Sequence, residues 1–422
     1  MYRLAFSLLL LSAPLTAQEP DILPGVLDRE SLAAAVADRN PSLEAARYAW
    51  QAASARAPQE RALANPMVSY GLAPLSVGSD VPFGHEIEIR QALPYPGKRQ
   101  ARVAMAEAEA GAAFQDYREA LLELTAQASN LAGDWYLVHR SLEVNDQHLR
   151  LLDSFREVAA ARYAAGLAMQ QDPLQAEVES AKLLQMGAEL EAERRVIASR
   201  INALLHRDPG APLPPPLARL PELEIPADAA ALEAEALAAR PELAGRASMI
   251  QAREAQLRMA LLERRPDFEA MGRYSSMWTD PEHRWMAGVA VDLPLRRGRT
   301  EAARTEAEAR LAQARSERAA AEIQVRAEVR EAWELLRESH HHLDIQRNRV
   351  LPATRDQVRA ASTGFETGGS FLAVIEAERN LREAELQEHE LLTEHHHRQA
   401  MLDRVLGRLP PYPKTAEARD EP

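Results

Sequence analysis

The chain has 422 residues, a formal net charge of −13 and no cysteine. The acidic balance argues against nucleic acid as a partner, and without thiols we expect neither a disulfide nor a lipid-modified cysteine. Hydrophobic residues make up 46% of the chain but aromatic residues only 5%, so much of the apolar content is alanine. This composition favours closely packed long helices over a single thick core.

Residues 1–17 are predicted to be a secretory signal peptide. Arg3 gives a positive start, residues 4–11 form a short apolar run, and Ala17 closes a small-residue cleavage site. The run is too short to be a membrane anchor, and no later run approaches the ~18–20 apolar residues of a membrane helix. If the mature chain enters a membrane, we expect it to do so by β-strands.

Residues 98–207 are predicted to form a long helical hairpin. Ala, Glu, Leu, Gln and Arg dominate this stretch, and all are strong helix formers. The predicted break is at residues 162–168, where Gly166 can end the first helix in a left-handed conformation. Asp172 can then cap the second helix, with Pro173 in its first turn. The first helix would reach ~100 Å at ~1.5 Å per residue, so the hairpin must project from a base.

The residues before this hairpin predict two helices and a strand pair. The first helix is expected to start at a Ser31 cap and to end at Asn40-Pro41, and the second to cover residues 42–64. Residues 67–93 contain the strand pair, because apolar and charged residues alternate in its second half. A Pro-rich connector, residues 208–226, follows the hairpin.

The same order then recurs about 200 residues later. Pro241, Pro266 and Pro294 follow Pro41, Pro66 and Pro94 at this offset. A second strand pair is predicted at 268–293 and a second helical hairpin at 300–406, kinked at Pro352. The predicted segments are the signal peptide 1–17, the first repeat 18–207, the connector 208–226, the second repeat 227–408 and a disordered tail 409–422.

Four strands in one chain cannot close a membrane barrel, since known single-chain barrels begin at about eight. Open strand edges are not tolerated in lipid, so several protomers would have to share one barrel. Aromatic residues lie near the strand ends, as interfacial residues do: Tyr70, Tyr274, Trp278 and Trp285. The alternative is a soluble helical protein with two small β-hairpins.

The order of these elements resembles that of the TolC-like outer membrane efflux proteins. The resemblance includes the strand exit QALPYPGKR at residues 91–99 and the hairpin tips at 162–168 and 364–368. It is strongest to the heavy-metal (CzcC- and CusC-like) branch, although members of that branch often carry a lipid-anchor cysteine that this chain lacks. The implied fold class is mainly α with a small β part, a trimeric α-helical barrel joined to an outer-membrane β-barrel, with four strands per protomer and an internal duplication.

The resemblance implies an exit duct in the outer membrane that extends into the periplasm. It would pass substrate, heavy-metal cations in this branch, from a periplasmic adaptor and an inner-membrane RND transporter to the exterior. The implied partners are two further copies of the chain, the adaptor, the pump and outer-membrane lipid. The alternatives are the same duct for drugs or type I secreted polypeptides, and a non-conducting periplasmic spacer or adhesin.

The hairpin tips are the predicted adaptor-docking sites, because small residues let a partner helix approach closely. The alternative is that these glycines only end helices. The predicted docking residues are Gly166, Leu167, Ala168, Gly368, Gly369 and Ser370.

We expect no enzyme activity and no cofactor, since the chain has no catalytic set, phosphate loop or zinc spacing. The runs His340–His342 and His395–His397 cannot each close on one ion, because successive helical residues point about 100° apart and no pair has the i, i+4 spacing. We therefore predict solvated helix faces. His340 and His395 remain candidates for a transient metal contact.

Overall fold

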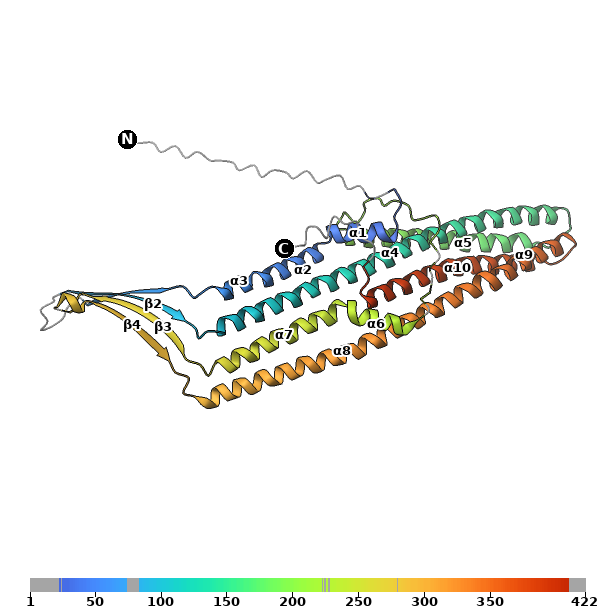
Figure 1. Cartoon of the computed structure of the whole chain (residues 1–422). Helices are drawn as coiled ribbons and strands as arrows, with labels where there is room; N and C mark the ends of the chain where they lie inside the picture. The colour runs from blue at the N-terminus through green and yellow to red at the C-terminus, as the bar shows by residue number, and fades with distance from the viewer. Residues whose placement is uncertain are drawn as a thin grey trace, which may run out of the picture.

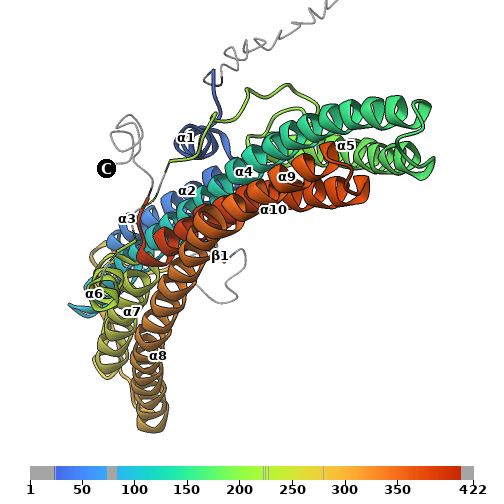
Figure 2. The ribbon, with the colours of Figure 1, turned by 90° about the vertical axis from the view of Figure 1, so that its right-hand side faces the viewer.

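A computed structural model describes residues 23, 25–73, 83–221, 223, 225–226, 228–278 and 280–409. The molecule is elongated, with a small sheet at one end and long helices running away from it (Figure 1). Seen from the helical end, the helices follow an arc, so the chain forms a curved wall (Figure 2). The predicted signal peptide 1–17 lies outside the described residues, as does nearly all of the predicted tail 409–422.

The chain is mainly helical with one small sheet, as predicted, and its two halves contain similar orders of elements. The first half consists of α1 (Arg29–Arg39), α2 (Pro41–Ser54), α3 (Arg56–Arg61), β1 (Met67–Ala73), β2 (Gly84–Leu93), α4 (Lys98–Ala164) and α5 (Gln171–Leu204). The second half consists of α6 (Ala229–Ala239), α7 (Pro241–Leu262), β3 (Asp267–Ser275), a 3₁₀ turn (Pro281–His283), β4 (Trp285–Asp292), α8 (Arg297–Ile345), a π turn (Gln346–Val350), α9 (Leu351–Glu366) and α10 (Phe371–Leu406).

All four strands form one antiparallel sheet in the order β1-β2-β3-β4. The two predicted strand pairs are therefore joined, because β2 also pairs with β3, with Leu93 opposite Phe268. The outer ends of the two predicted strand pairs, 67–93 and 268–293, agree with the strands to within one residue.

Two predictions about the first helices were wrong. The cap of α1 is Asp28, whose carboxylate accepts from the backbone N–H of Ser31 at 2.7 Å, while Ser31 serves as the third helical residue of a capping box. The predicted helix 42–64 is two helices, because the chain breaks at Ala55 and leaves helical geometry after Arg61.

The first helical hairpin is close to its prediction. α4 begins after Gly97, which has a φ of 99°, and its 67 residues span roughly 100 Å. Pro173 lies in the first turn of α5, as predicted, although Asp172 is already helical and the N-cap is Gln170. α5 ends at Leu204 rather than Arg207, because His206 adopts a φ of 55°.

The predicted kink at Pro352 is a π turn just before it, at residues 346–350. Proline has no N–H to continue the helical ladder, and the bond that Pro352 cannot make would end at Asn348, inside this turn. The side-chain amide of Gln346 lies in this turn and donates to the carbonyl of Ala384 on α10 at 2.7 Å. The return helix α10 has its predicted bounds.

The connector, residues 208–226, contacts a long helix in each half of the molecule. The indole of Trp135 on α4 donates to the carbonyl of Pro214 at 3.0 Å, and that of Trp333 on α8 donates to Pro226 at 2.8 Å. Proline carbonyls suit this contact, because proline brings no N–H of its own that would need a partner. One apolar cluster joins α1, α4 and α5, and another joins α6, α8 and α10.

Candidate functional site

The two hairpin tips end their first helices in the same way. Gly166 and Gly368 take positive φ values of 72° and 102°. The residue after each then bonds back to the helix: the N–H of Leu167 to Arg162 O at 2.8 Å, and the N–H of Gly369 to Gly364 O at 2.8 Å. This is the Schellman pattern of helix termination. These glycines are therefore helix stops, whatever else they do.

The predicted docking residues differ in what they expose. Leu167 is 70% exposed and its neighbour Met169 is 67% exposed, whereas Ala168 is half-buried. On the second tip Gly368, Gly369 and Ser370 are exposed and offer no apolar side chain. Among the six predicted docking residues only Leu167 thus exposes a large apolar side chain, which the glycine pattern alone does not indicate.

Arg162 holds the two tips of one chain together. Its guanidinium donates to the carbonyl of Phe365 at 2.9 Å and lies 4.3 Å from the centre of the Phe365 ring. That ring packs against Phe371 at 5.3 Å between centroids. Sequence analysis placed Arg162 and Phe365 at the tips but could not predict this contact, because it joins residues about 200 positions apart.

A buried charged group lies between the hairpins, on the tip side of the connector. His148 on α4 places Nε2 3.0 Å from Glu385 and Nδ1 3.4 Å from Glu378, both on α10. Burial alone would lower the pKa of His148, but the two carboxylates outweigh it and raise the pKa to about 9. The side chains of His148 and Glu378 are 8% and 5% exposed, so a cation here is held inside the wall. This site was missed, since no sequence motif links its members.

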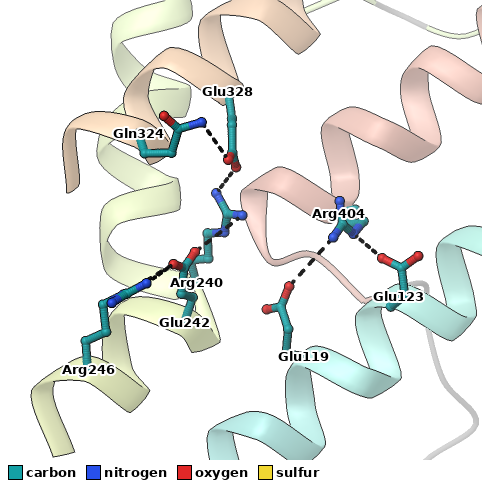
Figure 3. Close-up of polar contacts among 8 residues, drawn as sticks. All are labelled: Glu119, Glu123, Arg240, Glu242, Arg246, Gln324, Glu328 and Arg404. Carbon is teal, nitrogen blue, oxygen red and sulfur yellow. Dashed lines mark hydrogen bonds and ion pairs between the residues drawn. The ribbon is translucent and has the colours of Figure 1, made fainter. Parts of the chain in front are cut away.

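A second polar network joins α7 and α8 near the start of α7 (Figure 3). The buried Arg240 contacts Glu328 on α8 and Glu242, and Gln324 also donates to Glu328 at 3.1 Å. Burial would raise the pKa of Glu328, but the bonds from Arg240 and Gln324 lower it. Arg240 occupies the place of Asn40 in the first half, whose amide donates to Leu204 O at 2.9 Å.

Beside this network, Arg404 on α10 makes a separate set of contacts with α4. It lies 2.6 Å from Glu123 and 4.0 Å from Glu119, and Figure 3 shows both carboxylates pointing toward it from α4. Burial raises the pKa of Glu119. These contacts tie the end of α10 to α4 of the first half, which is a structural role, and a small cavity beside them is lined by Arg29, Asp403 and Arg404 among others.

The prediction of solvated histidine faces was right for one run and wrong for the other. His340, His341 and His342 are exposed, but His395 is only 2% exposed. His396 donates to the connector carbonyl of Pro221 at 3.0 Å, and burial lowers its pKa to about 4. The difference arises because the connector covers this part of α10.

The described residues hold no group of three or more His, Cys, Asp or Glu side chains arranged around one ion. The structure does bring the two candidate residues together, since the rings of His340 and His395 lie 5.5 Å apart between centroids.

The sheet has one apolar and one charged face. Residues directly opposite in paired strands point to the same face, and so do residues two apart along one strand. Val68 lies opposite Ile89, while Gln91, two residues further on, lies opposite Ala270, which lies opposite Val289. These five residues therefore share one face. Large apolar side chains on this face are exposed, including Tyr70 at 60%, Trp285 at 75% and Val289 at 69%.

The other face carries charged side chains on the two central strands, β2 and β3. Arg90 pairs with Glu88 and lies 3.8 Å from Glu269, and Arg273 lies 3.7 Å from Glu86. Within the part of the chain that the structure describes, β1 and β4 each pair on one side only. The sheet therefore has two open edges and an exposed apolar surface.

None of the helices in the described part of the chain is long and apolar enough to span a membrane.

Residues 232–408 match the family model of outer membrane efflux proteins. The fold is also that of solved outer-membrane channel structures. VceC from Vibrio cholerae superposes with a TM-score of 0.76 at 18% identity, covering 90% of this chain and 96% of that one. CusC superposes with a TM-score of 0.77 at 17% identity, covering 91% of this chain and 93% of that one. The open state of MtrE from Neisseria gonorrhoeae superposes with a TM-score of 0.75 at 16% identity, covering 93% of this chain and 94% of that one. No curated protein matches the chain in sequence.

Proposed function

We propose that three copies of this chain form an outer-membrane exit duct that continues as a helical tunnel into the periplasm. The observation that carries the proposal is the sheet. It has an apolar face for lipid, a charged face for a water-filled lumen, and two open edges that neighbouring copies would satisfy. The curved helical wall supports it further, since three such arcs can enclose a tunnel (Figure 2).

The proposal includes a tripartite system, in which a periplasmic adaptor and an inner-membrane RND transporter deliver the substrate. The exposed Leu167 and Met169 at the first tip support docking there, because a helical partner can bury them in an apolar groove. We propose heavy-metal cations as the cargo, on the strength of the strand exit at residues 91–99. The similarity to CusC does not add to this, since its identity is no higher than that to VceC.

Reconstitution tests the duct. The mature chain, purified in detergent, is expected to be a trimer by light scattering and to open stepwise, cation-conducting channels in planar bilayers. The charged lumen face predicts that replacing Glu86 and Glu269 by Gln changes the ratio of cation to anion permeability without changing trimer content. A monodisperse monomer, or a trimer without conductance, would rule out the proposal in favour of a spacer.

The docking residues are tested separately in cells. Leu167→Asp with Met169→Asp should leave trimer levels in the outer membrane unchanged, because the strands lie roughly 100 Å from the tip. Resistance to the exported ion should fall by at least about tenfold, since two buried anchors are lost. The matched control is Gln170→Asp, which adds a charge beside them without removing apolar surface. Equal resistance in both variants would show that the tip only turns the chain.

A further inference from the structure

We propose that His340 and His395 form a two-histidine binding site for a divalent transition-metal ion, Zn²⁺, Cu²⁺ or Ni²⁺. The site lies between α8 and α10 beside the connector and is independent of the proposed duct. Neither histidine run can supply it alone, since adjacent helical residues diverge. The site exists only because two helices place one ring of each run side by side.

The first argument is the proton on His395. The hydroxyl of Ser339 donates to the carbonyl of Leu336 at 2.8 Å, and a serine hydroxyl has a single proton. We assign the 2.9 Å contact between Ser339 Oγ and Nδ1 of His395 to a bond that Nδ1–H donates. This places the lone pair of the neutral ring on Nε2, the form in which imidazole binds metals.

The second argument is that this lone pair has no partner. Nε2 of His395 is buried and has no well-aligned hydrogen bond to any described residue, although buried polar atoms are normally satisfied. The backbone carbonyl of Leu223 lies beside the ring, but as an acceptor it is a partner only for a ring that carries its proton on Nε2. A buried acceptor whose ring is fixed by a second hydrogen bond is the arrangement found at histidine metal ligands.

The third argument is distance. An ion about 2.0–2.1 Å from one nitrogen of each ring keeps the two centroids within about 6.4 Å of each other. The observed separation is 5.5 Å. His340 is exposed, so it gives the ion a route from solvent, and water can complete the coordination shell. Imidazole ligands favour Zn²⁺, Cu²⁺ and Ni²⁺ over Mg²⁺ or Ca²⁺.

The two histidines that follow His395 contact backbone carbonyls instead. Nε2 of His396 donates to the carbonyl of Pro221 at 3.0 Å, and Nε2 of His397 lies 3.1 Å from the carbonyl of Asn130. A nitrogen that donates to a carbonyl carries a proton and cannot bind a metal at that atom. His341 is exposed on a different side of α8, which makes it a matched control.

The test is a titration of the full mature chain, purified without a histidine tag, with ZnCl₂ in an isothermal calorimeter. One ion per protomer is expected. His340→Ala should weaken binding at least about tenfold, and Ser339→Ala, which frees Nδ1 of His395, about 10–100-fold. His341→Ala should bind as the wild type does. Cu²⁺ loaded at the same stoichiometry should show nitrogen hyperfine coupling that is reduced in His340→Ala.

Three results would overturn the site. One is no saturable Zn²⁺ binding by the wild type, as expected if Nε2 instead holds the proton and directs it at Leu223. Another is equal affinity in His340→Ala. The third is an equal loss in His341→Ala, which would indicate loose binding by the exposed run. His340 and His341 are both exposed, so neither substitution is expected to unfold the chain, and circular dichroism of each variant checks this.

Discussion

His148 is a charge held inside a layer of packed helices. A cation in this place is stable only because Glu378 and Glu385 face both ring nitrogens. Arg355 lies 3.7 Å from Glu385, and the small cavity beside the ring is also lined by Glu179, Arg379 and Arg382. The site therefore fastens α4 of the first half to α10 of the second through charge as well as apolar contact.

This site predicts a pH dependence of stability. The pKa of His148 is about 9 in the folded chain and about 6.5 when unfolded. Its stabilising contribution is thus fully present below pH ~6.5 and is lost as the pH rises through 9. His148→Gln should lower stability by on the order of 2 kcal/mol at pH 6, with the partial exposure of Glu385 limiting the effect.

The measurement is the melting temperature in detergent at pH 6, 7.5 and 9. The gap between wild type and His148→Gln should narrow toward pH 9. His341→Gln, an exposed histidine, should show no gap at any of these values. A gap that widens with pH would mean that the folded chain holds a neutral His148.

At the scale of elements, equivalent places in the two halves use different chemistry for the same purpose. Asn40 caps α2 and bonds to the end of α5, whereas Arg240 precedes α7 and bonds to α8. Gly407 ends α10 against this point, since an added Cβ would lie 3.2 Å from the carbonyl oxygen of Ala239. In each half a polar residue before a helical proline fixes where several helices meet.

Arg240→Met should therefore destabilise the chain by about 2 kcal/mol, because Glu328 loses its charged donor. Combining it with Glu328→Gln should cost less than the sum of the two single changes, with a coupling of about 1–2 kcal/mol. Thermal unfolding of the four chains in the cycle measures this. Additive effects would show that the contact between Arg240 and Glu328 in Figure 3 contributes nothing to the free energy of unfolding.

The sequence predicted those elements whose signals are local. Helix formers, Gly166 and Pro173 were enough for the first hairpin, and the period-2 pattern was enough for β2. The break at Ala55 had a local signal that was missed, because Pro58 lies in the first turn of α3 and has no N–H to bond to the carbonyl of Ser54, where α2 ends. Contacts such as Arg162 with Phe365, or Ser339 with His395, depend on how separate helices align, and one sequence contains no signal for that.

At the scale of the whole molecule, the sheet edges make one chain incomplete. β1 and β4 offer unpaired backbone groups, and such edges recruit further strands. In the proposed trimer, β1 of one copy lies beside β4 of the next. The absence of cysteine from the chain makes this neighbourhood directly testable.

Cysteines introduced at Ser69 on β1 and Gly288 on β4 should cross-link between copies with a short bifunctional thiol reagent. The double variant should give covalent dimers and trimers on denaturing gels, because each copy offers both edges. Each single variant should stay monomeric there, since it lacks the partner thiol. Internal linkage without dimers would mean that one chain closes on itself.

The pairing of β2 with β3 can form only after the long segment between them has been synthesised. β2 ends at Leu93 and β3 begins at Asp267, so about 170 residues separate two strands that lie side by side. At roughly 5–20 residues per second, the ribosome needs about 10–35 s to make that interval. The edge of β2 that pairs with β3 has no native partner during this time, so we expect the first β-hairpin to be more prone to non-native strand pairing than any helix.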